Sequence, residues 1–207
     1  MKGIFINIIN LKIYFICYNA VMGIKIIQFK DEYLNDIRAI NVSVSSNPNK
    51  PDEKKVFSQH LYIDYYTEFS KENCFVAINC KNNEIVGYII SEVDFHRYKQ
   101  HMITYYTPQA KAINKEFEQI IKEEVESYVP FINKYDAHLH MDVKPGYQHQ
   151  GIGTMMLQYL FNHLKNIGCK GVMLSVSKSN ERANNFYEKH GMKIIGENKS
   201  YIRGKIL

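Results

Sequence analysis

The alternation of apolar and polar residues predicts strands and helices that follow one another along the chain. In the first half this pattern gives a strand over 24–29, a helix over 31–44, a helix over 54–70 and a hairpin over 74–94. Asp31 is expected to cap the first helix, and Asn82 and Asn83 are expected to form the hairpin turn. Pro48 and Pro51 mark a loop between the two helices, because proline interrupts regular elements.

The second half begins with an inserted region, 95–135, in which residues 107–129 predict one long helix. The remaining elements follow the same pattern: strand 137–143, helix 151–167, strand 171–177, helix 180–190 and strands 192–196 and 201–207. Acidic residues occupy the polar positions of the long helix: Glu116, Glu118, Glu123, Glu124 and Glu126. We interpret them as a solvated face, with a docking surface for a cationic acceptor as the alternative.

This order of elements is typical of one α/β domain over 22–207, because no repeat, low-complexity tract or Pro/Gly-rich linker divides it. We expect a mixed central sheet of six or seven strands with helices on both faces. Residues 1–21 are apolar, but Asn7, Asn10 and Lys12 interrupt a stretch shorter than the roughly 20 apolar residues of a membrane span. Three interpretations of this extension stay open: a start codon placed too early, an extra ordered strand, or an export signal.

Charge and cysteine content narrow the classes of function. The formal charge of +5 is modest and evenly spread, so it does not indicate nucleic-acid binding and suits an anionic small ligand equally well. The four cysteines, Cys17, Cys74, Cys80 and Cys169, form no CxxC pair and no metal-binding spacing with histidine. We therefore expect free thiols in a reducing cytoplasm, no bound metal and no membrane span.

Gly151 and Gly153 lie where strand 137–143 gives way to helix 151–167, within YQHQGIGTMM. The first N–H groups of a helix have no carbonyl partner in that helix, and the helix dipole makes this end positive. Glycine lets the main chain curl and lets an anion approach these amides. The junction therefore predicts a binding site for an anion such as a pyrophosphate.

Two common phosphate-binding motifs do not fit the junction. A dinucleotide-binding turn would read GxGxxG, but Met156 stands at the third glycine position. A P-loop would place a lysine directly after its last glycine, and no lysine follows Gly153.

The stretch from Gln148 to Gly153 instead resembles the [QR]xxGx[GA] signature of the GNAT superfamily of acetyl-CoA-dependent N-acetyltransferases. Residues 180–192, NERANNFYEKHGM, look like the NxxAxxFYxKxGF stretch of that family, with Met192 in place of phenylalanine. The motif-bearing part spans residues 137–196. The resemblance implies a V-shaped GNAT sheet that opens beside Met141, and acetyl-CoA as co-substrate.

A narrower likeness concerns YDAHLHMDVKPGYQHQGIGTMML. This stretch looks like the acetyltransferase-like domains associated with glycoside hydrolases that remove O-GlcNAc. Some of those relatives are regarded as pseudo-enzymes that have lost the cofactor loop, whereas the loop is intact here.

The resemblance assigns roles residue by residue. The cofactor contacts that it implies are Met141, Asp142, Val143, Gln148, His149, Gln150, Gly151, Ile152, Gly153, Thr154, Asn180, Phe186 and Tyr187. The amides of 149–154 would hold the pyrophosphate, and an amide of Met141 or Asp142 would polarise the thioester carbonyl. Asn180 would bind the pantetheine or cap its own helix. Tyr187 would protonate the leaving thiolate, and its alternative role is that of a core aromatic.

The general base is less sharply indicated. Direct transfer requires a neutral amine, so an ammonium substrate must first lose a proton. His138, His140 and Asp142 alternate along strand 137–143 and therefore share a face. Asp142 and His140 are the candidates, although a histidine on a buried strand is commonly structural. Tyr62, Tyr65, Tyr66 and Glu68, on helix 54–70, are interpreted as packing residues or acceptor contacts.

Two functions follow from these observations. The first is an N-acetyltransferase that moves an acetyl group to a primary amine of a small molecule, sugar or peptide. The second is a non-catalytic acyl-CoA-binding or partner-docking module with the same fold. The acceptor and the oligomeric state stay open, with a homodimer as one alternative.

Overall fold

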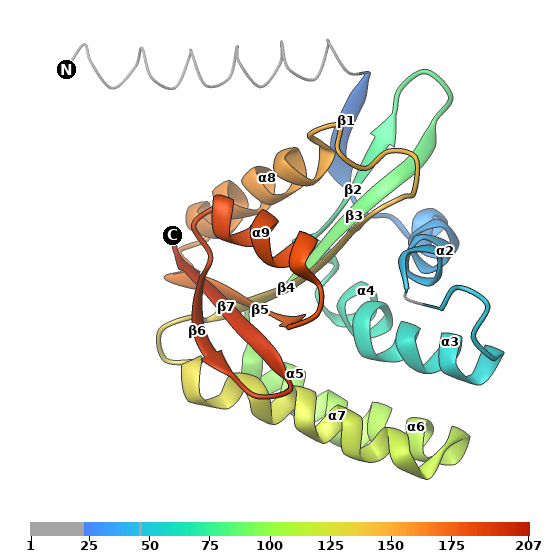
Figure 1. The fold of residues 1–207 in the computed structure, drawn as a ribbon, viewed down its shortest axis with the longest axis vertical. Helices are drawn as coiled ribbons and strands as arrows, with labels where there is room; N and C mark the ends of the chain where they lie inside the picture. The colour runs from blue at the N-terminus through green and yellow to red at the C-terminus, as the bar shows by residue number, and fades with distance from the viewer. Residues whose placement is uncertain (1–22, 46) are drawn as a thin grey trace.

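A seven-stranded sheet forms the centre of the protein, and only one pair of neighbouring strands in it is parallel (Figure 1). The computed structural model describes residues 23–45 and 47–207, so the interpretations of residues 1–21 lie outside the described part. The strands are β1 (Ile24–Gln28), β2 (Cys74–Asn79), β3 (Glu84–Glu92), β4 (Ala137–Val143), β5 (Gly171–Ser177), β6 (Lys193–Glu197) and β7 (Ser200–Ile206). Their order across the sheet is β1-β2-β3-β4-β5-β7-β6, which confirms the mixed sheet.

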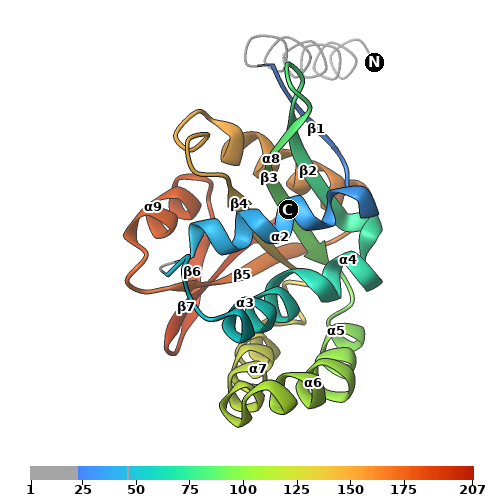
Figure 2. The same cartoon turned by 90° about the vertical axis from the view of Figure 1, so that its right-hand side faces the viewer.

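Helices cover both faces of this sheet (Figures 1 and 2). The α-helices are α2 (Leu34–Val44), α3 (Asp52–Gln59), α4 (Tyr65–Phe69), α5 (Phe95–His101), α6 (Thr107–Ile113), α7 (Lys115–Tyr128), α8 (Ile152–Asn166) and α9 (Glu181–Lys189). The π-helical turns η2 (His60–Asp64) and η4 (Met102–Tyr106) connect α3 to α4 and α5 to α6. None of the helices in the described part is long and apolar enough to cross a membrane.

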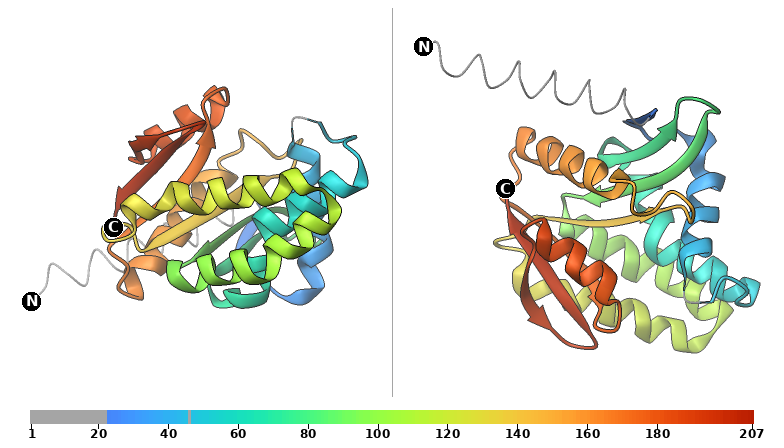
Figure 3. Two further views of the ribbon diagram at one scale, coloured as in Figure 1. Left: turned by 90° about the horizontal axis from the view of Figure 1, so that it is seen from below. Right: turned by 45° about the horizontal axis from the view of Figure 1, so that its top comes forward.

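Successive side chains of a strand point to opposite faces of the sheet, so the apolar side chains form two cores, one on each face. On one face, α8 and α9 pack on residues such as Ala137 and Leu139 of β4. On the other face, α2, α4, α5 and α7 enclose a core that contains Tyr66, Tyr98 and Tyr128. In the view from below, α7 runs alongside the segment that contains α5 and α6 (Figure 3). Successive residues of β4 therefore face opposite helical layers.

The sheet opens as a V between β4 and β5. These two strands pair only at Ala137 with Val172 and at His138 with Met173. On its other side, β4 stays paired with β3 as far as Val143. The edge of β4 beyond His138 is thus free of β5, which confirms the predicted opening beside Met141.

Two local expectations are wrong. Lys30 rather than Asp31 occupies the N-cap position of the turn that precedes α2, and no side chain bonds to that end. The helix expected over 107–129 is broken at Asn114, which is extended and accepts a hydrogen bond from the Glu116 N–H at 3.0 Å. Asparagine side chains compete with the helix backbone for such bonds, so Asn114 ends α6 and caps α7.

Candidate active site

A cavity of about 360 Å³ lies where β4 and β5 part. Its walls come from strands β3, β4, β5 and β7 and from α2, α3, η2, α7 and α9. The candidates His140, Asp142, Asn180 and Tyr187 all line it, although they come from distant parts of the chain. The volume is within the range of small-ligand sites. The fold therefore brings the two candidates of β4 together with Asn180 and Tyr187 of the second motif in one space, whereas no residue of the glycine junction lines it.

The Asp142 carboxylate is held by a network that the sequence did not reveal. The Tyr88 hydroxyl donates to Asp142 Oδ2, and Asn41 Nδ2 lies 3.5 Å from the same oxygen. Ser58 Oγ donates to Asn41 Oδ1 at 3.0 Å and so orients the amide. Burial raises the pKa of Asp142 to about 6, although these hydrogen bonds oppose the rise. The carboxylate is thus fixed in place and has a proton affinity closer to neutrality than usual.

His138 and His140 share the face of Asp142, as the alternation predicts, but only His140 lines the cavity. Burial lowers the pKa of His140 to about 4 and that of His138 to about 3. Both imidazoles are therefore neutral at pH 7. Because its pKa is lower, His140 is a weaker base than Asp142.

Tyr187 projects from α9 into the cavity and is only 8% exposed. Burial, followed by the charge of Asp142, raises the pKa of Tyr187 well above its ordinary value. Its phenol consequently carries a proton throughout the ordinary pH range.

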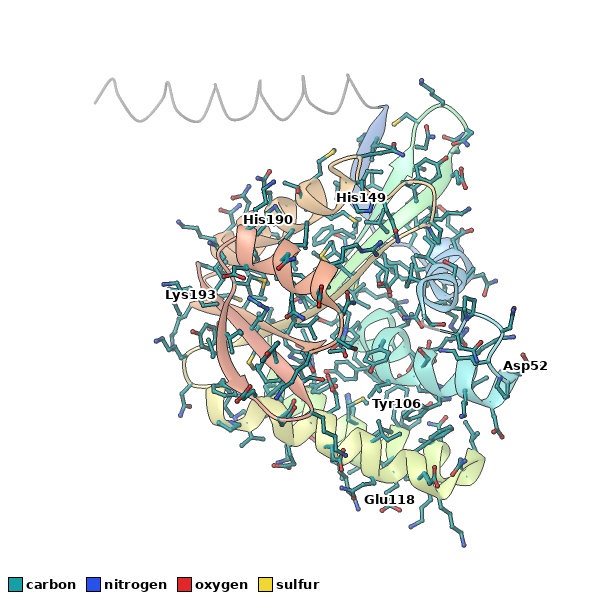
Figure 4. All side chains as sticks on the ribbon, in the orientation of Figure 1. Asp52, Tyr106, Glu118, His149, His190 and Lys193 are labelled. Carbon is teal, nitrogen blue, oxygen red and sulfur yellow. The ribbon has the colours of Figure 1, made fainter. Side chains whose placement is uncertain are left out.

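The glycine junction has the backbone of an anion-binding turn. Gly151 is the N-cap of α8 with φ of +80°, and His149 also has a positive φ of +63°. The first bond of the helix runs from the Met155 N–H to the Gly151 carbonyl at 3.0 Å, so the N–H groups of 152–154 precede the helical ladder. Figure 4 shows His149 in the loop ahead of this helix. The exposed amides and the positive end of the dipole fit a pyrophosphate.

Side-chain hydrogen bonds tie this turn to its surroundings. Gln148 Nε2 donates to the Val143 carbonyl at 3.0 Å, and Gln148 Oε1 accepts from Arg182 at 2.8 Å. Gln150 Nε2 donates to the Gly146 carbonyl at 2.8 Å within the loop. The Gln148 side chain therefore joins β4, the turn and α9, which leaves the main chain of the loop to face a ligand.

Gly153 serves a different purpose from Gly151. A Cβ atom built on Gly153 would lie 3.3 Å from Phe186 Cζ and 3.6 Å from Met141 Cε. Any larger side chain would push α8 away from α9 and β4. Thr154, one residue later, is held by His190 Nε2 at 3.0 Å, and His190 lies at the end of α9 (Figure 4).

The free edge of β4 indicates which amide faces the opening. The Lys144 N–H donates to the Val86 carbonyl of the β3 side at 2.9 Å, and Asp142 lies opposite Tyr88 in the same register. Backbone groups alternate in direction along a strand, so the Asp142 amide also points to β3. The Met141 amide then points to the gap beside β5. Of the two predicted oxyanion donors, the geometry favours Met141.

The remaining predicted residues divide between the cavity and the core. Asn180 Oδ1 accepts from the Ala183 N–H at 3.1 Å and so caps α9 at the rim of the cavity. Tyr65 and Tyr66 are fully buried in the core, whereas Tyr62 lines the cavity. Glu68 accepts a hydrogen bond from a core tyrosine, Tyr106, at 2.7 Å.

Glu124 corrects the interpretation of the acidic helix. We expected it on a solvated face of α7, but it is one of the residues that line the cavity, as Tyr62 and His140 are. Figure 4 shows Glu118, by contrast, at the outer side of the helical layer. Charge alone could not have distinguished these two glutamates.

Comparison with known proteins agrees with this geometry. A model of the acetyltransferase (GNAT) family matches residues 43–192. The crystal structure of SsHAT has a TM-score of 0.78 at 20% identity, covering 89% of this chain and 98% of that one. A mosquito arylalkylamine N-acetyltransferase like 5b has a TM-score of 0.60 at 15% identity, with 89% and 100% coverage.

The PaiA N-acetyltransferase of Thermoplasma acidophilum, solved in complex with coenzyme A, has a TM-score of 0.56 at 16% identity. It covers 90% of this chain and 100% of that one. At these identities the likeness to solved structures establishes the fold. The narrower resemblance to domains associated with glycoside hydrolases is not shown by these matches and stays an expectation.

Proposed function

The chain belongs to the acetyltransferase (GNAT) family and has acetyl-CoA as its co-substrate, and from this premise we propose that it acetylates a primary amine of a small molecule or peptide by direct attack. The observation that carries the proposal is the shared cavity. Asp142, a carboxylate of raised pKa, and Tyr187, a phenol that keeps its proton, both line this cavity where β4 and β5 part, which supports their roles as base and acid.

The chain has groups that could bind both the pyrophosphate end and the thioester end of acetyl-CoA. The amides of 149–154 would hold the pyrophosphate, and the free edge of β4 from Met141 to Val143 would pair with the pantetheine arm. Asn180 and Phe186 would flank that arm. Acetyl-CoA supplies an acetyl group activated as a thioester, and the Met141 amide would hydrogen-bond the carbonyl oxygen as negative charge develops on it.

Proton transfers balance the reaction. An ammonium acceptor first loses one proton to Asp142. The neutral nitrogen then bonds to the acetyl carbon, the carbon–sulfur bond breaks, and the nitrogen releases a second proton that replaces the one given up by Tyr187. Tyr187 gives its proton to the departing thiolate. Tyr88 and Asn41 hold Asp142 in position. His140 remains the second candidate base, because it shares the cavity but has a lower pKa.

The test is the release of coenzyme A from acetyl-CoA over a panel of amines that includes small amines, amino sugars and peptides. We expect turnover with at least one class of acceptor. If acetyl-CoA binds in calorimetry and no acceptor causes release, the proposed catalysis fails and the alternative, a non-catalytic acyl-CoA-binding module, takes its place.

A further inference from the structure

Glu124 differs from the neighbouring glutamates of α7 in what it faces. Glu118, Glu123 and Glu126 each form a salt bridge with a lysine at 2.7 Å. Glu124 lines the cavity, and no lysine or arginine of the described residues lies within salt-bridge distance of it. Glu116 in the first turn also has no salt bridge among the described residues, but it is exposed, so Glu124 is the glutamate of α7 that brings an unpaired carboxylate to the cavity.

The position of the Glu124 carboxylate is fixed from behind. Tyr128 is fully buried one turn later, and its hydroxyl donates to Glu124 Oε1 at 3.0 Å. The same hydroxyl accepts a hydrogen bond from the Ser175 N–H of β5 at 3.1 Å. Tyr128 therefore links α7 to β5 and holds one oxygen of Glu124. Within the part of the chain that the structure describes, no donor is recorded for the other oxygen.

The surroundings suit a positive charge. Burial raises the pKa of Glu124, because the carboxylate is desolvated without a cation beside it. Of the described residues that line the cavity, none is a lysine or arginine. Tyr62 lines the same cavity as Glu124 and Asp142, and the charges of both carboxylates add to the effect of burial in raising the pKa of its phenol. An aromatic wall with two carboxylates is favourable for ammonium groups.

We propose that Glu124 binds a second cationic nitrogen of the acceptor, so that the substrate class is an aliphatic diamine or polyamine. The inference rests on the proposed acetyl transfer and narrows its acceptor. One nitrogen of the acceptor faces Asp142 and the thioester, while the other stays protonated and pairs with the free oxygen of Glu124. A monoamine leaves this carboxylate without a cation, and an acceptor with a carboxylate at that end is repelled.

A matched pair of acceptors tests the proposal: 1,5-diaminopentane and n-pentylamine, which differ by one terminal amine. In the wild type, kcat/KM is expected to be about 10- to 100-fold higher for the diamine, as for a hydrogen bond to a charged group. Glu124→Gln keeps the acceptor for the Tyr128 hydroxyl but removes the charge. This variant should raise KM for the diamine about 10- to 100-fold with little change in kcat, so that the preference for the diamine over pentylamine largely disappears.

Glu126→Gln is the control. Glu126 lies on the same helix but does not line the cavity, and its Oε1 forms a salt bridge with Lys99 Nζ at 2.7 Å. It should keep the preference of the wild type for the diamine. The melting temperature of each variant shows whether it is folded. Equal losses with both acceptors in Glu124→Gln, or no preference for the diamine in the wild type, overturn the inference.

A binding measurement separates this inference from the proposed function. Calorimetry with coenzyme A present measures diamine binding without turnover. If no amine is acetylated but the diamine binds and Glu124→Gln weakens that binding at least tenfold, acetyl transfer fails and the cation site stands. If Glu124→Gln binds the diamine as tightly as the wild type does, the cation site fails, whatever the enzyme acetylates.

Discussion

Replacing Asp142 with asparagine should remove the proposed base while keeping the shape of the cavity. Asparagine has nearly the same size, and its carbonyl oxygen can still accept the hydrogen bond of the Tyr88 hydroxyl. Proton transfer by a positioned side chain typically contributes about 10²–10⁴-fold to a rate. We expect kcat of Asp142→Asn to fall by that factor, with a much smaller change in the Kd for acetyl-CoA.

The raised pKa makes Asp142 a stronger base, and the size of the shift gives the size of this effect. Burial moves the pKa of Asp142 from 3.8 to about 6. At 1.36 kcal/mol per pKa unit, this shift brings the proton affinity of the carboxylate about 3 kcal/mol closer to that of an alkyl amine, whose ammonium form has a pKa of about 10.4. An unperturbed aspartate would be a correspondingly poorer base.

The assay follows initial rates of thiol release at saturating acetyl-CoA from about pH 5 to about pH 9. In the wild type, kcat should fall about tenfold per unit below pH about 6, because Asp142 becomes protonated. Asp142→Asn should lack this acid limb. A variant that turns over at the wild-type rate, with the acid limb intact, would refute the assignment of Asp142 as base.

The same shift predicts a pH dependence of stability. The folded pKa of Asp142 lies above its unfolded value, so the folded state binds the proton more tightly between about pH 4 and pH 6. The free energy of unfolding should therefore decrease as pH rises through this window, by up to about 3 kcal/mol from this group. Denaturant titrations of wild type and Asp142→Asn measure the contribution as the difference between their pH profiles. Identical profiles would contradict the raised pKa.

Two further substitutions test the other proposed roles. Tyr187→Phe keeps the ring, so kcat should fall about 10²–10⁴-fold while the melting temperature and the Kd for acetyl-CoA change little; wild-type turnover would make Tyr187 a packing residue. Gly151→Val should weaken acetyl-CoA binding, because its side chain takes the place of the anion at a φ of +80°. Gly168→Val, at the other end of α8 with a φ of +87°, carries similar strain and should bind normally in calorimetry.

The elements with a clear local signal were predictable from the sequence. The residues of β4 alternate in polarity, and Gly151 and Gly153 mark the start of α8, so the strand and the glycine turn that precedes the helix agree with expectation. The break at Asn114 was missed, because asparagine is tolerated in a helix pattern and its capping role depends on the conformation that the chain adopts there. The apolar residues before and after Asn114 keep helical spacing, so the pattern gives no sign of the break.

The surroundings of the candidate base could not be predicted, because they depend on contacts between distant segments. Tyr88 and Asn41 reach Asp142 from positions 54 and 101 residues away along the chain. The environment of Glu124 likewise depends on Tyr128, which anchors α7 to β5. Periodicity identifies the polar side of a helix, but it does not say whether that side meets solvent or a cavity.

Buried carboxylates elsewhere in this chain do have cationic partners. Glu92 is fully buried and accepts two hydrogen bonds from Arg97 at 2.9 Å, and Asp64 pairs with Arg38 at 2.7 Å. Such pairing offsets the cost of desolvating a charge. Asp142 and Glu124 line the cavity without a salt bridge among the described residues, and burial raises the pKa of both. A local departure of this kind is expected at a functional site, where the missing charge arrives with the ligand. A cationic acceptor would give Asp142 and Glu124 the cationic partners that Glu92 and Asp64 already have.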